Sequence, residues 1–115
     1  MDYNRFIGGG RLTRDPEIKY TGDGTAVAEF GIAINRQKGV DFFDVVAFDK
    51  MANFVETYFR KGKPIFIEGR IRLEQWESDG QKRSRVRVVA ERVQFVGPKE
   101  DAATQEQVNG EDVPF

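Results

Sequence analysis

The sequence of 115 residues contains no cysteine and no histidine. These absences exclude a disulfide framework, a zinc site built from Cys and His ligands, a thiol nucleophile and any catalytic pair that needs an imidazole base. No window approaches the roughly 20 consecutive apolar residues that span a bilayer, and residues 1–5 show no basic stretch leading into an apolar run. We expect one small, soluble and cytoplasmic domain that holds no metal and no cofactor.

The charge is divided unevenly along the chain. Of 18 Lys and Arg and 19 Asp and Glu, residues 99–115 hold one base and five acids, which leaves 17 bases and 14 acids in residues 1–98. The net charge is therefore +3 for the body and −4 for the segment that follows it. Pro98 cannot donate to a sheet ladder, and the polar residues beyond it have little to bury. We predict a folded domain over residues 1–98 and a disordered acidic tail over residues 99–115.

The tail ends in three apolar residues, Val113, Pro114 and Phe115. An apolar end gives a solvated segment no benefit of its own, so it suggests a docking peptide for a partner protein. The alternative is a frayed terminus without a role.

Period-two alternation and many β-branched or aromatic residues predict that the body consists mainly of strands. Turn residues bound five expected strands, at residues 3–13, 25–36, 40–49, 64–78 and 81–96. Residues 50–61 change to a helical period, with apolar residues on one face at Met51, Phe54, Val55, Tyr58 and Phe59. Gly62 stands where this helix should stop, and Asp79-Gly80 is a strong signal for a two-residue hairpin.

Five long strands with one helix between the third and the fourth are typical of the five-stranded Greek-key barrel called the OB-fold. Gly8, Gly9 and Gly10 interrupt the first expected strand and would let it bend, as closure of a barrel requires. An open five-stranded sheet backed by the helix is the alternative architecture. We predict an all-β OB-fold with a single helix.

The strand expected at residues 64–78 has one apolar and one mixed face. We expect its odd positions inside the barrel, at Ile65, Ile67, Gly69, Ile71 and Leu73. Its even positions then face outward, at Phe66, Glu68, Arg70, Arg72, Glu74 and Trp76, and the hairpin continues into Lys82, Arg83, Arg85 and Arg87. Aromatic rings among guanidinium groups suit the stacking of bases and the neutralisation of phosphates. The alternative is a solvated strand whose charges pair across the hairpin.

In the strand expected at residues 40–49, Phe42 and Phe48 share one face, and Phe43, Val45 and Ala47 share the other. A thin barrel cannot enclose both faces, and a monomer gains little by leaving phenylalanines in water. One set should therefore meet a partner subunit or a ligand, and periodicity alone does not decide which. The alternative is that Phe42 and Phe48 are both core residues and that Phe43 is exposed.

Asp41, Asp44 and Asp49 could suggest the carboxylate cluster of a two-metal nuclease. Asp41 and Asp44 are an odd number of residues apart and so point to opposite faces of a regular strand, and no Lys or His is placed to act as a general acid or base. The segment from Gly8 to Arg11 lacks the strand-to-helix context and the ending of a phosphate-binding loop. We therefore predict a binding protein rather than an enzyme.

Several segments, in order and at compatible spacing, resemble the bacterial single-stranded DNA-binding protein family over nearly the whole chain. They are residues 10–21 (GRLTRDPEIKYT), 24–30 (GTAVAEF), 58–62 (YFRKG), 67–71 (IEGRI) and 112–115 (DVPF). The resemblance implies sequence-independent binding and protection of single-stranded DNA during replication, recombination and repair, in association with the nucleoid and not with a membrane.

Carried over to this chain, the resemblance implies roles for individual residues. The base-stacking positions are Phe42, Phe48 and Trp76, and the positions near the DNA backbone are Arg5, Arg70, Arg72 and Arg83. Phe43 falls where the family packs subunits together, which implies a homotetramer. The tip that docks replication and repair enzymes corresponds to Glu111, Asp112, Val113, Pro114 and Phe115.

The chain departs from the family pattern at several points. The connection after Arg36 is short and lacks an aromatic residue, which removes one stacking site, and the tail is brief. Asp44 and Glu74 stand where positive charge is expected, which would weaken binding. Gly8 and Gly9 replace apolar strand residues, for which the sequence offers no reason. Two other functions stay open: an OB-fold RNA-binding or primosome-type accessory protein, and a protein-interaction module that uses the same aromatic residues.

Overall fold

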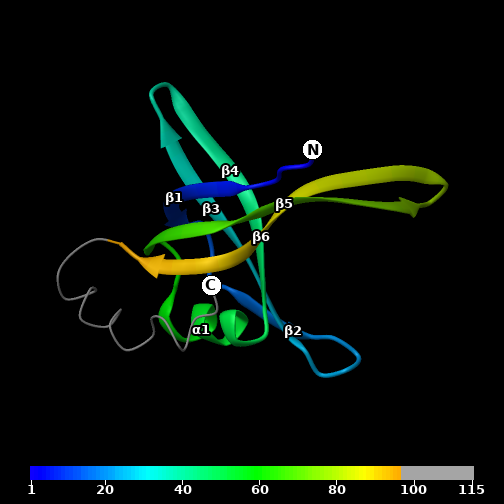
Figure 1. Ribbon diagram of the computed structural model, residues 1–115, viewed down its shortest axis with the longest axis horizontal. Coiled ribbons are helices and arrows are strands. Elements are labelled where there is room, and N and C mark those ends of the chain that lie inside the picture. Colours follow the sequence, from blue (N-terminus) through cyan, green and yellow to red (C-terminus); the bar gives the residue numbers. More distant parts are fainter. Residues whose placement is uncertain (97–115) are drawn as a thin grey trace.

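The computed structural model describes residues 1–96 (Figure 1). Its elements follow in the order β1 (Phe6–Leu12), β2 (Glu17–Tyr20), β3 (Ala26–Arg36), β4 (Gly39–Phe48), α1 (Lys50–Tyr58), β5 (Pro64–Ser78) and β6 (Gln81–Phe95). The tail predicted over residues 99–115, including its docking peptide, lies outside the described residues. Among residues 1–96, no helix has the length and apolar character needed to cross a membrane.

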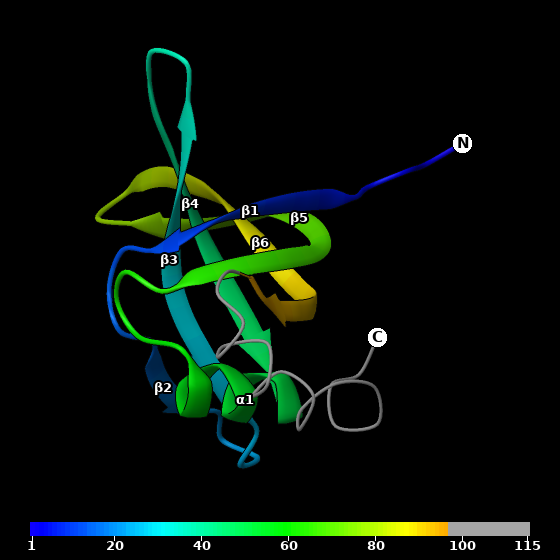
Figure 2. The same cartoon turned by 90° about the vertical axis from the view of Figure 1, so that its left-hand side faces the viewer.

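The strands form a closed sheet (Figure 2). Its order is β1-β5-β6-β4-β3-β2, and β1 pairs with β3 as well as with β5. The pairing of β4 with β6 is parallel, whereas the other pairings are antiparallel. Closure of the sheet hides most strand edges. A closed barrel with one helix, α1, covering one end is the arrangement of the OB-fold. The predicted fold class is confirmed, and the open-sheet alternative is wrong.

The first predicted strand, residues 3–13, is followed by a second strand that the sequence does not predict. The first spans Phe6–Leu12 as β1, and the second, the short strand β2, follows after Pro16. The connection between them is held in place because Oδ1 of Asp15 accepts a hydrogen bond of 2.8 Å from the amide of Lys61, beyond the helix. Both strands pair with β3, so together they occupy the place of one strand in a five-stranded barrel.

Helix α1 ends at Tyr58, earlier than its periodicity predicts. The next residue, Phe59, is extended, with φ −122° and ψ 141°, and its side chain is fully buried. Its ring stacks on Phe95 of β6, with 4.8 Å between ring centres. Burying this ring is worth more than extending the helix, so the chain leaves the helix at Phe59 and turns at Gly62, where φ is +88°.

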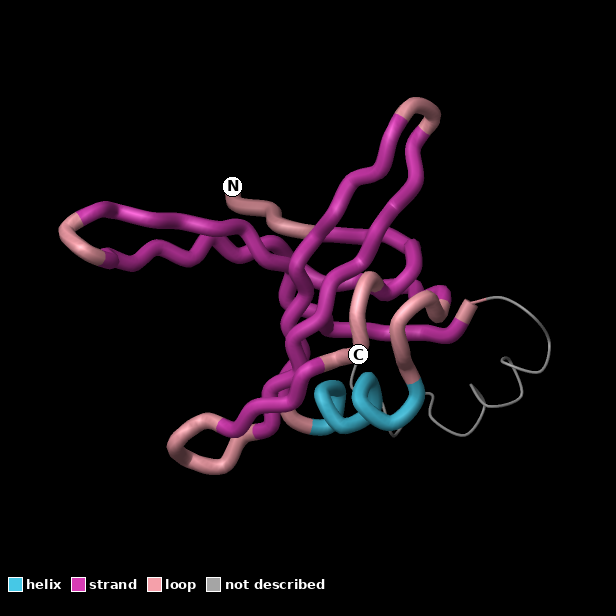
Figure 3. The backbone as a smooth tube through the Cα atoms, turned by 180° about the vertical axis from the view of Figure 1, so that it is seen from behind, coloured by secondary structure: helices cyan, strands magenta, loops and turns pink. Residues whose placement is uncertain are grey.

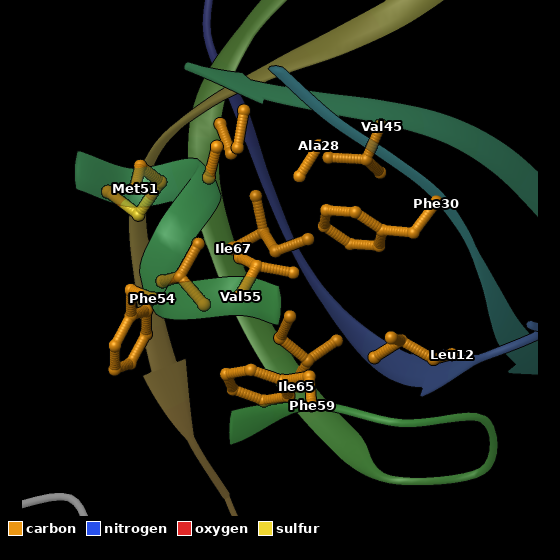
Figure 4. Close-up of a cluster of buried hydrophobic side chains, with 14 of the residues drawn as sticks. Leu12, Ala28, Phe30, Val45, Met51, Phe54, Val55, Phe59, Ile65 and Ile67 are labelled. Atoms are coloured by element: carbon orange, nitrogen blue, oxygen red, sulfur yellow. The ribbon is translucent and has the colours of Figure 1, made fainter. Parts of the chain in front are cut away.

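The barrel interior holds the main apolar core (Figure 4). Its largest fully buried side chains include Phe30 and Ile32 of β3, Ile65 and Ile67 of β5, and Phe59. Those of β3 and β5 stand two residues apart along each strand, as expected for strands with one inward face. Helix α1 adds its apolar face, which the sequence predicts, to one end of this core.

The β5–β6 hairpin projects well beyond the barrel (Figure 1). Its turn has positive φ at both Asp79 (53°) and Gly80 (77°), the conformation that a two-residue hairpin favours, so the predicted turn is confirmed. Because the outer half of β5 has left the barrel, Ile71 and Leu73 are 42% and 57% exposed. Their predicted place in the interior is wrong, whereas the earlier odd positions of β5 are buried as predicted.

Close approach of backbones explains part of the glycine pattern. A Cβ atom on Gly10 would lie 2.2 Å from the carbonyl oxygen of Ala33, and one on Gly69 would lie 2.0 Å from that of Val89. Neither distance is compatible with a side chain, so both positions require glycine for the strands to meet as they do. A Cβ atom on Gly9 would have its nearest neighbour at 3.4 Å, so nothing in its surroundings requires glycine there.

Candidate nucleic-acid interface

The register of the sheet brings the predicted ring residues to one side. Paired residues on neighbouring strands share a side of the sheet, as do residues two apart along a strand. Trp76 and Arg72 thus share a side of β5, and Arg72 pairs with Arg87 of β6, which pairs in turn with Asp44 of β4. The even positions of β4 therefore lie on the same side as Trp76. We call the side that carries Phe42, Phe48 and Trp76 the ring face.

The three rings differ in exposure. Phe42 is 71% exposed on the β3–β4 hairpin, and Trp76 is 44% exposed on the β5–β6 hairpin. Phe48 is half-buried because it packs against a small apolar cluster of Val27, Val46 and Val89. The alternative in which Phe42 is a core residue is therefore wrong, while the role of the rings in stacking stays a prediction.

Phe43 faces away from these rings. Its side chain is half-buried against the main core, and its ring meets that of Phe6 edge-on, with 5.3 Å between centres. The alternative in which Phe43 is the exposed residue of this strand is therefore wrong. Its contact with another subunit stays a prediction.

The outer end of the β5–β6 hairpin forms a groove beside Trp76. Figure 3 shows this hairpin extending to one side of the barrel and the β3–β4 hairpin extending in another direction. The groove has a volume of about 340 Å³ and is lined by Gln75, Trp76, Glu77, Lys82 and Arg83. The guanidinium carbon of Arg85 lies 5.8 Å from the centre of the Trp76 ring, within cation–π range. Arg83 makes no ion pair with any of residues 1–96, so its charge is available to a ligand.

Arg5 and Arg70 share a carboxylate partner. Nη1 of Arg5 lies 3.5 Å from Glu91, and Nη1 of Arg70 donates to the same side chain at 2.6 Å. Arg5 also lies 3.9 Å from Glu68, which accepts a hydrogen bond of 3.3 Å from Arg92. The alternative of charges paired across the hairpin therefore holds for Arg70 and Glu68, and also for Glu74, which pairs with arginines of β6. A phosphate that approaches Arg5 or Arg70 must compete with carboxylates.

Glu74 holds three arginines on the ring face, and we call these four residues the Glu74 cluster. Its Oε2 atom accepts hydrogen bonds from Arg72 at 2.9 Å and from Arg87 at 2.7 Å, and its Oε1 atom accepts one from Arg85 at 2.9 Å. Arg87 is 8% exposed and also donates to Glu29 of β3 at 3.1 Å. The hydrogen bond from Arg87, supported by those from Arg85 and Arg72, lowers the pKa of Glu74 to about 2.

Acidification should weaken the Glu74 cluster. A carboxylate whose pKa is lowered by folding stabilises the protein fully above its ordinary pKa of 4.5, and this contribution is lost as the pH falls toward about 2. We expect Glu74→Gln to lower the free energy of unfolding by about 1.5 kcal/mol at neutral pH. This difference from the wild type should shrink between pH 4.5 and pH 2, because protonation neutralises Glu74 in the wild type as well. Thermal unfolding of both proteins over this range measures the effect, and a difference that stays constant would contradict it.

The aspartates of β4 take part in separate ion pairs. Asp41 pairs with Arg36 at 3.0 Å, and Asp44 pairs with Arg14 at 3.9 Å. Within residues 1–96, no group of three or more acidic side chains lies close enough together to hold a metal ion. The charge of Asp44, which was expected to weaken the binding of an anion, is thus partly offset by Arg14.

Comparison with known proteins supplies the family. The model of the "Single-strand binding protein family" matches residues 3–96, which include the whole barrel and all residues of the ring face. The chain belongs to the single-strand binding protein family. Its match leaves out the segment that carries the predicted docking peptide.

Relatives from three bacteria carry the name single-stranded DNA-binding protein. The protein of Treponema pallidum is 40% identical over 104 residues, which cover 84% of this chain and 59% of the relative. The proteins of Fusobacterium nucleatum and Aquifex aeolicus are 39% and 42% identical, over 90% and 91% of this chain and 73% and 77% of the relatives. The chain thus spans less than two thirds of the Treponema protein and about three quarters of the other two.

In this member of the single-strand binding protein family, the ring face includes residues absent from the predicted site. Arg85 and Arg87 lie with Arg83 on one side of β6, which their spacing of two residues already indicates. The structure also brings two predicted residues together, because the guanidinium carbon of Arg72 lies 5.7 Å from the centre of the Phe48 ring. The hydrogen bond from Arg87 of the Glu74 cluster to Glu29 of β3 has no local sequence signal, since it depends on closure of the barrel.

Proposed function

We propose that this family member binds single-stranded DNA without sequence preference and without catalysing a reaction. The observation that carries the proposal is the ring face, where Phe42, Phe48 and Trp76 share one side of the sheet with a set of arginines. The names of the relatives, which are 39% to 42% identical to this chain, also support it.

Unpaired bases stack on the three rings. Stacking of this kind is worth about 1–3 kcal/mol per base, a range established on proteins of this class rather than derived from this structure. Every base offers a flat face, so stacking does not distinguish one base from another. In a duplex the faces of the bases are covered by their neighbours, so the rings favour single strands.

The phosphates are neutralised by basic side chains near the rings, at Arg5, Arg70, Arg72 and Arg83. Arg83 makes no ion pair with any of residues 1–96, whereas the other three must exchange a carboxylate partner for a phosphate. Neutralisation of phosphates releases counterions, which contributes affinity but carries no sequence information. Binding therefore weakens as the salt concentration rises.

The active form proposed is a homotetramer, assembled through the side of the barrel that carries Phe43. Residues 1–98 have a net charge of only +3, so several chains together would supply the basic surface that a long strand needs.

The acidic tail over residues 99–115 is proposed to recruit enzymes of replication, recombination and repair while residues 1–98 protect the strand. Phe115 would fill an apolar pocket rimmed by Lys or Arg on such an enzyme, next to Val113 and Pro114. Glu111 and Asp112 would support the approach through their charge. The composition of the segment, with a net charge of −4 and an apolar end, supports this role.

A titration with thymine oligomers of graded length tests the proposed function, because Trp76 is the sole tryptophan. We expect its fluorescence to be quenched up to a saturation point, and mass measurement of the complex to show four chains. Binding that leaves the spectrum of Trp76 unchanged would remove this residue from the site. A failure to bind at low salt would overturn the function.

Three further arms of the titration separate the alternatives. Tighter binding of a matched RNA strand would favour an RNA-binding protein, and binding to no nucleic acid would favour a protein-interaction module. A variant without residues 111–115 should bind DNA as tightly as the full chain or more tightly, because an acidic tail competes with phosphate. The same variant should lose the capture of partner enzymes, and weaker DNA binding would contradict the role of the tail.

A further inference from the structure

Both oxygens of Glu74 accept hydrogen bonds from arginines, and these arginines differ in exposure. The side chains of Arg72 and Arg85 are 39% and 47% exposed, whereas that of Arg87 is 10% exposed. Within residues 1–96, Arg72 and Arg85 have Glu74 as their only ion-pair partner, while Arg87 also has Glu29. Loss of the charge on Glu74 would therefore free two exposed arginines and leave the buried one paired.

The ion-paired group that includes Glu74 has more cations than acids. Lys19 of β2 pairs with Glu29 at 3.1 Å, so that Glu29 and Glu74 are shared among four cations and the group has a net charge of +2. A surplus of positive charge on an exposed sheet face is expected where the face meets an anion.

The two exposed arginines stand beside the rings. The guanidinium carbon of Arg72 lies 5.7 Å from the centre of the Phe48 ring, and that of Arg85 lies 5.8 Å from the centre of the Trp76 ring. A strand whose bases stack on these rings brings its phosphates close to both arginines. Carboxylate and phosphate groups bind guanidinium through the same charge-assisted hydrogen bonds, so Glu74 and the phosphates compete for the same donors.

We propose that Glu74 is an internal competitor for phosphate, which makes binding depend on stacked bases. The inference rests on the proposed function and specifies how that site selects its ligand. A polyanion without accessible bases must displace Glu74 from its arginines, so it gains little from their charge. A single strand meets the same competition but adds the stacking of its bases. Glu74 thus lowers the affinity for polyanions in general, so that stacking of bases has to supply the rest of the binding free energy.

The variant Glu74→Gln tests the competition, because it removes the charge and retains the shape of the side chain. We expect thymine oligomers to bind at least about tenfold more tightly at low salt, since two freed arginines can each form a phosphate contact. The plot of log K against log salt concentration should steepen by about 1.4, because each contact to a single strand adds about 0.7. An abasic oligomer of the same length, which offers phosphates but no bases, meets the same competition, so it should gain by about the same factor and the same change in salt slope.

Glu56→Gln on α1 is the matched control. It removes the same charge, but the side chain of Glu56 makes no ion pair with any of residues 1–96. We expect the salt dependence and the affinity for both the thymine and the abasic oligomer to stay close to wild-type values. An equal gain in both variants would show that only the net charge matters, and would overturn the competition.

Other outcomes also decide the question. If folded Glu74→Gln binds with the wild-type salt dependence, or more weakly, the competition is wrong although the wild type still binds DNA. If the wild type itself binds no thymine oligomer, the proposed function is wrong and this inference is wrong with it.

Should Glu74→Gln fold poorly, two arginine variants replace it: Arg83→Gln should reduce the salt slope by about 0.7, and Arg85→Gln by less. The opposite order would overturn the competition.

Discussion

Replacing Phe42, Phe48 and Trp76 together by alanine should lower the affinity for a thymine oligomer at least about a hundredfold. The expectation follows from about 1–3 kcal/mol of stacking per base, a range established on proteins of this class rather than derived from this structure. The arginines are retained, so weak binding that depends strongly on salt should persist. Titrations at two salt concentrations, followed by fluorescence anisotropy of a labelled oligomer, measure both effects.

The matched control is Tyr20→Ala, which removes an aromatic side chain that is 68% exposed but lies on β2, away from the ring face. We expect its affinity to equal that of the wild type. Phe42 and Trp76 are exposed, so their loss should change the melting temperature little. A folded triple variant that binds within a few-fold of the wild type would exclude stacking as the main source of affinity.

Gly10→Ala and Gly69→Ala should each lower the free energy of unfolding by on the order of 3 kcal/mol. In both positions the new Cβ atom would meet a backbone carbonyl oxygen, at 2.2 Å for Gly10 and 2.0 Å for Gly69, and a backbone cannot move aside as a flexible side chain can. The strands must therefore separate, which weakens the pairing of β1 with β3 in the first variant and the pairing of β5 with β6 in the second. Chemical denaturation of the two variants measures the loss.

Gly9→Ala provides the control within the same run of glycines. Its new Cβ atom would have 3.4 Å to its nearest neighbour, so we expect a change in unfolding free energy close to zero. An alanine there also restricts the unfolded chain, which acts in favour of the folded state. If Gly9→Ala and Gly10→Ala lower the free energy of unfolding equally, β1 requires glycine for its backbone conformation and not for the close approach of Gly10 to Ala33.

The sequence predicts the fold well where local signals agree with the closed barrel. Asp79-Gly80 specifies a two-residue turn, and this turn sets the register that places Trp76 opposite Arg83. The predicted end of α1 is wrong because Phe59 is buried against another strand, and a helical period contains no information on such long-range contacts. The predicted burial of Ile71 is wrong for a related reason, since alternation identifies a side of a strand but not where the strand leaves the barrel.

The candidate site is predictable to a similar degree. Alternation along β4 separates Phe42 and Phe48 from Phe43, and the resemblance to the family selects between the two sides. The register of the β5–β6 hairpin also implies that Glu74 faces Arg85. The ion pair between Arg87 of this hairpin and Glu29 is not predictable from the sequence. It depends on the parallel pairing of β4 with β6, and no turn specifies the register of that pairing.

That parallel pairing is short: within residues 1–96 it consists of the three register pairs from Asp44–Arg87 to Val46–Val89. Phe42 and Phe48 stand on one side of this narrow seam in the barrel wall, and Trp76 stands on the other. DNA that contacts all three rings would cross from β4 to the β5–β6 hairpin over this short pairing. Only the closed barrel brings the three rings together, so DNA binds the folded state in preference to an opened one. Bound DNA would therefore stabilise the pairing of β4 with β6 and raise the stability of the protein.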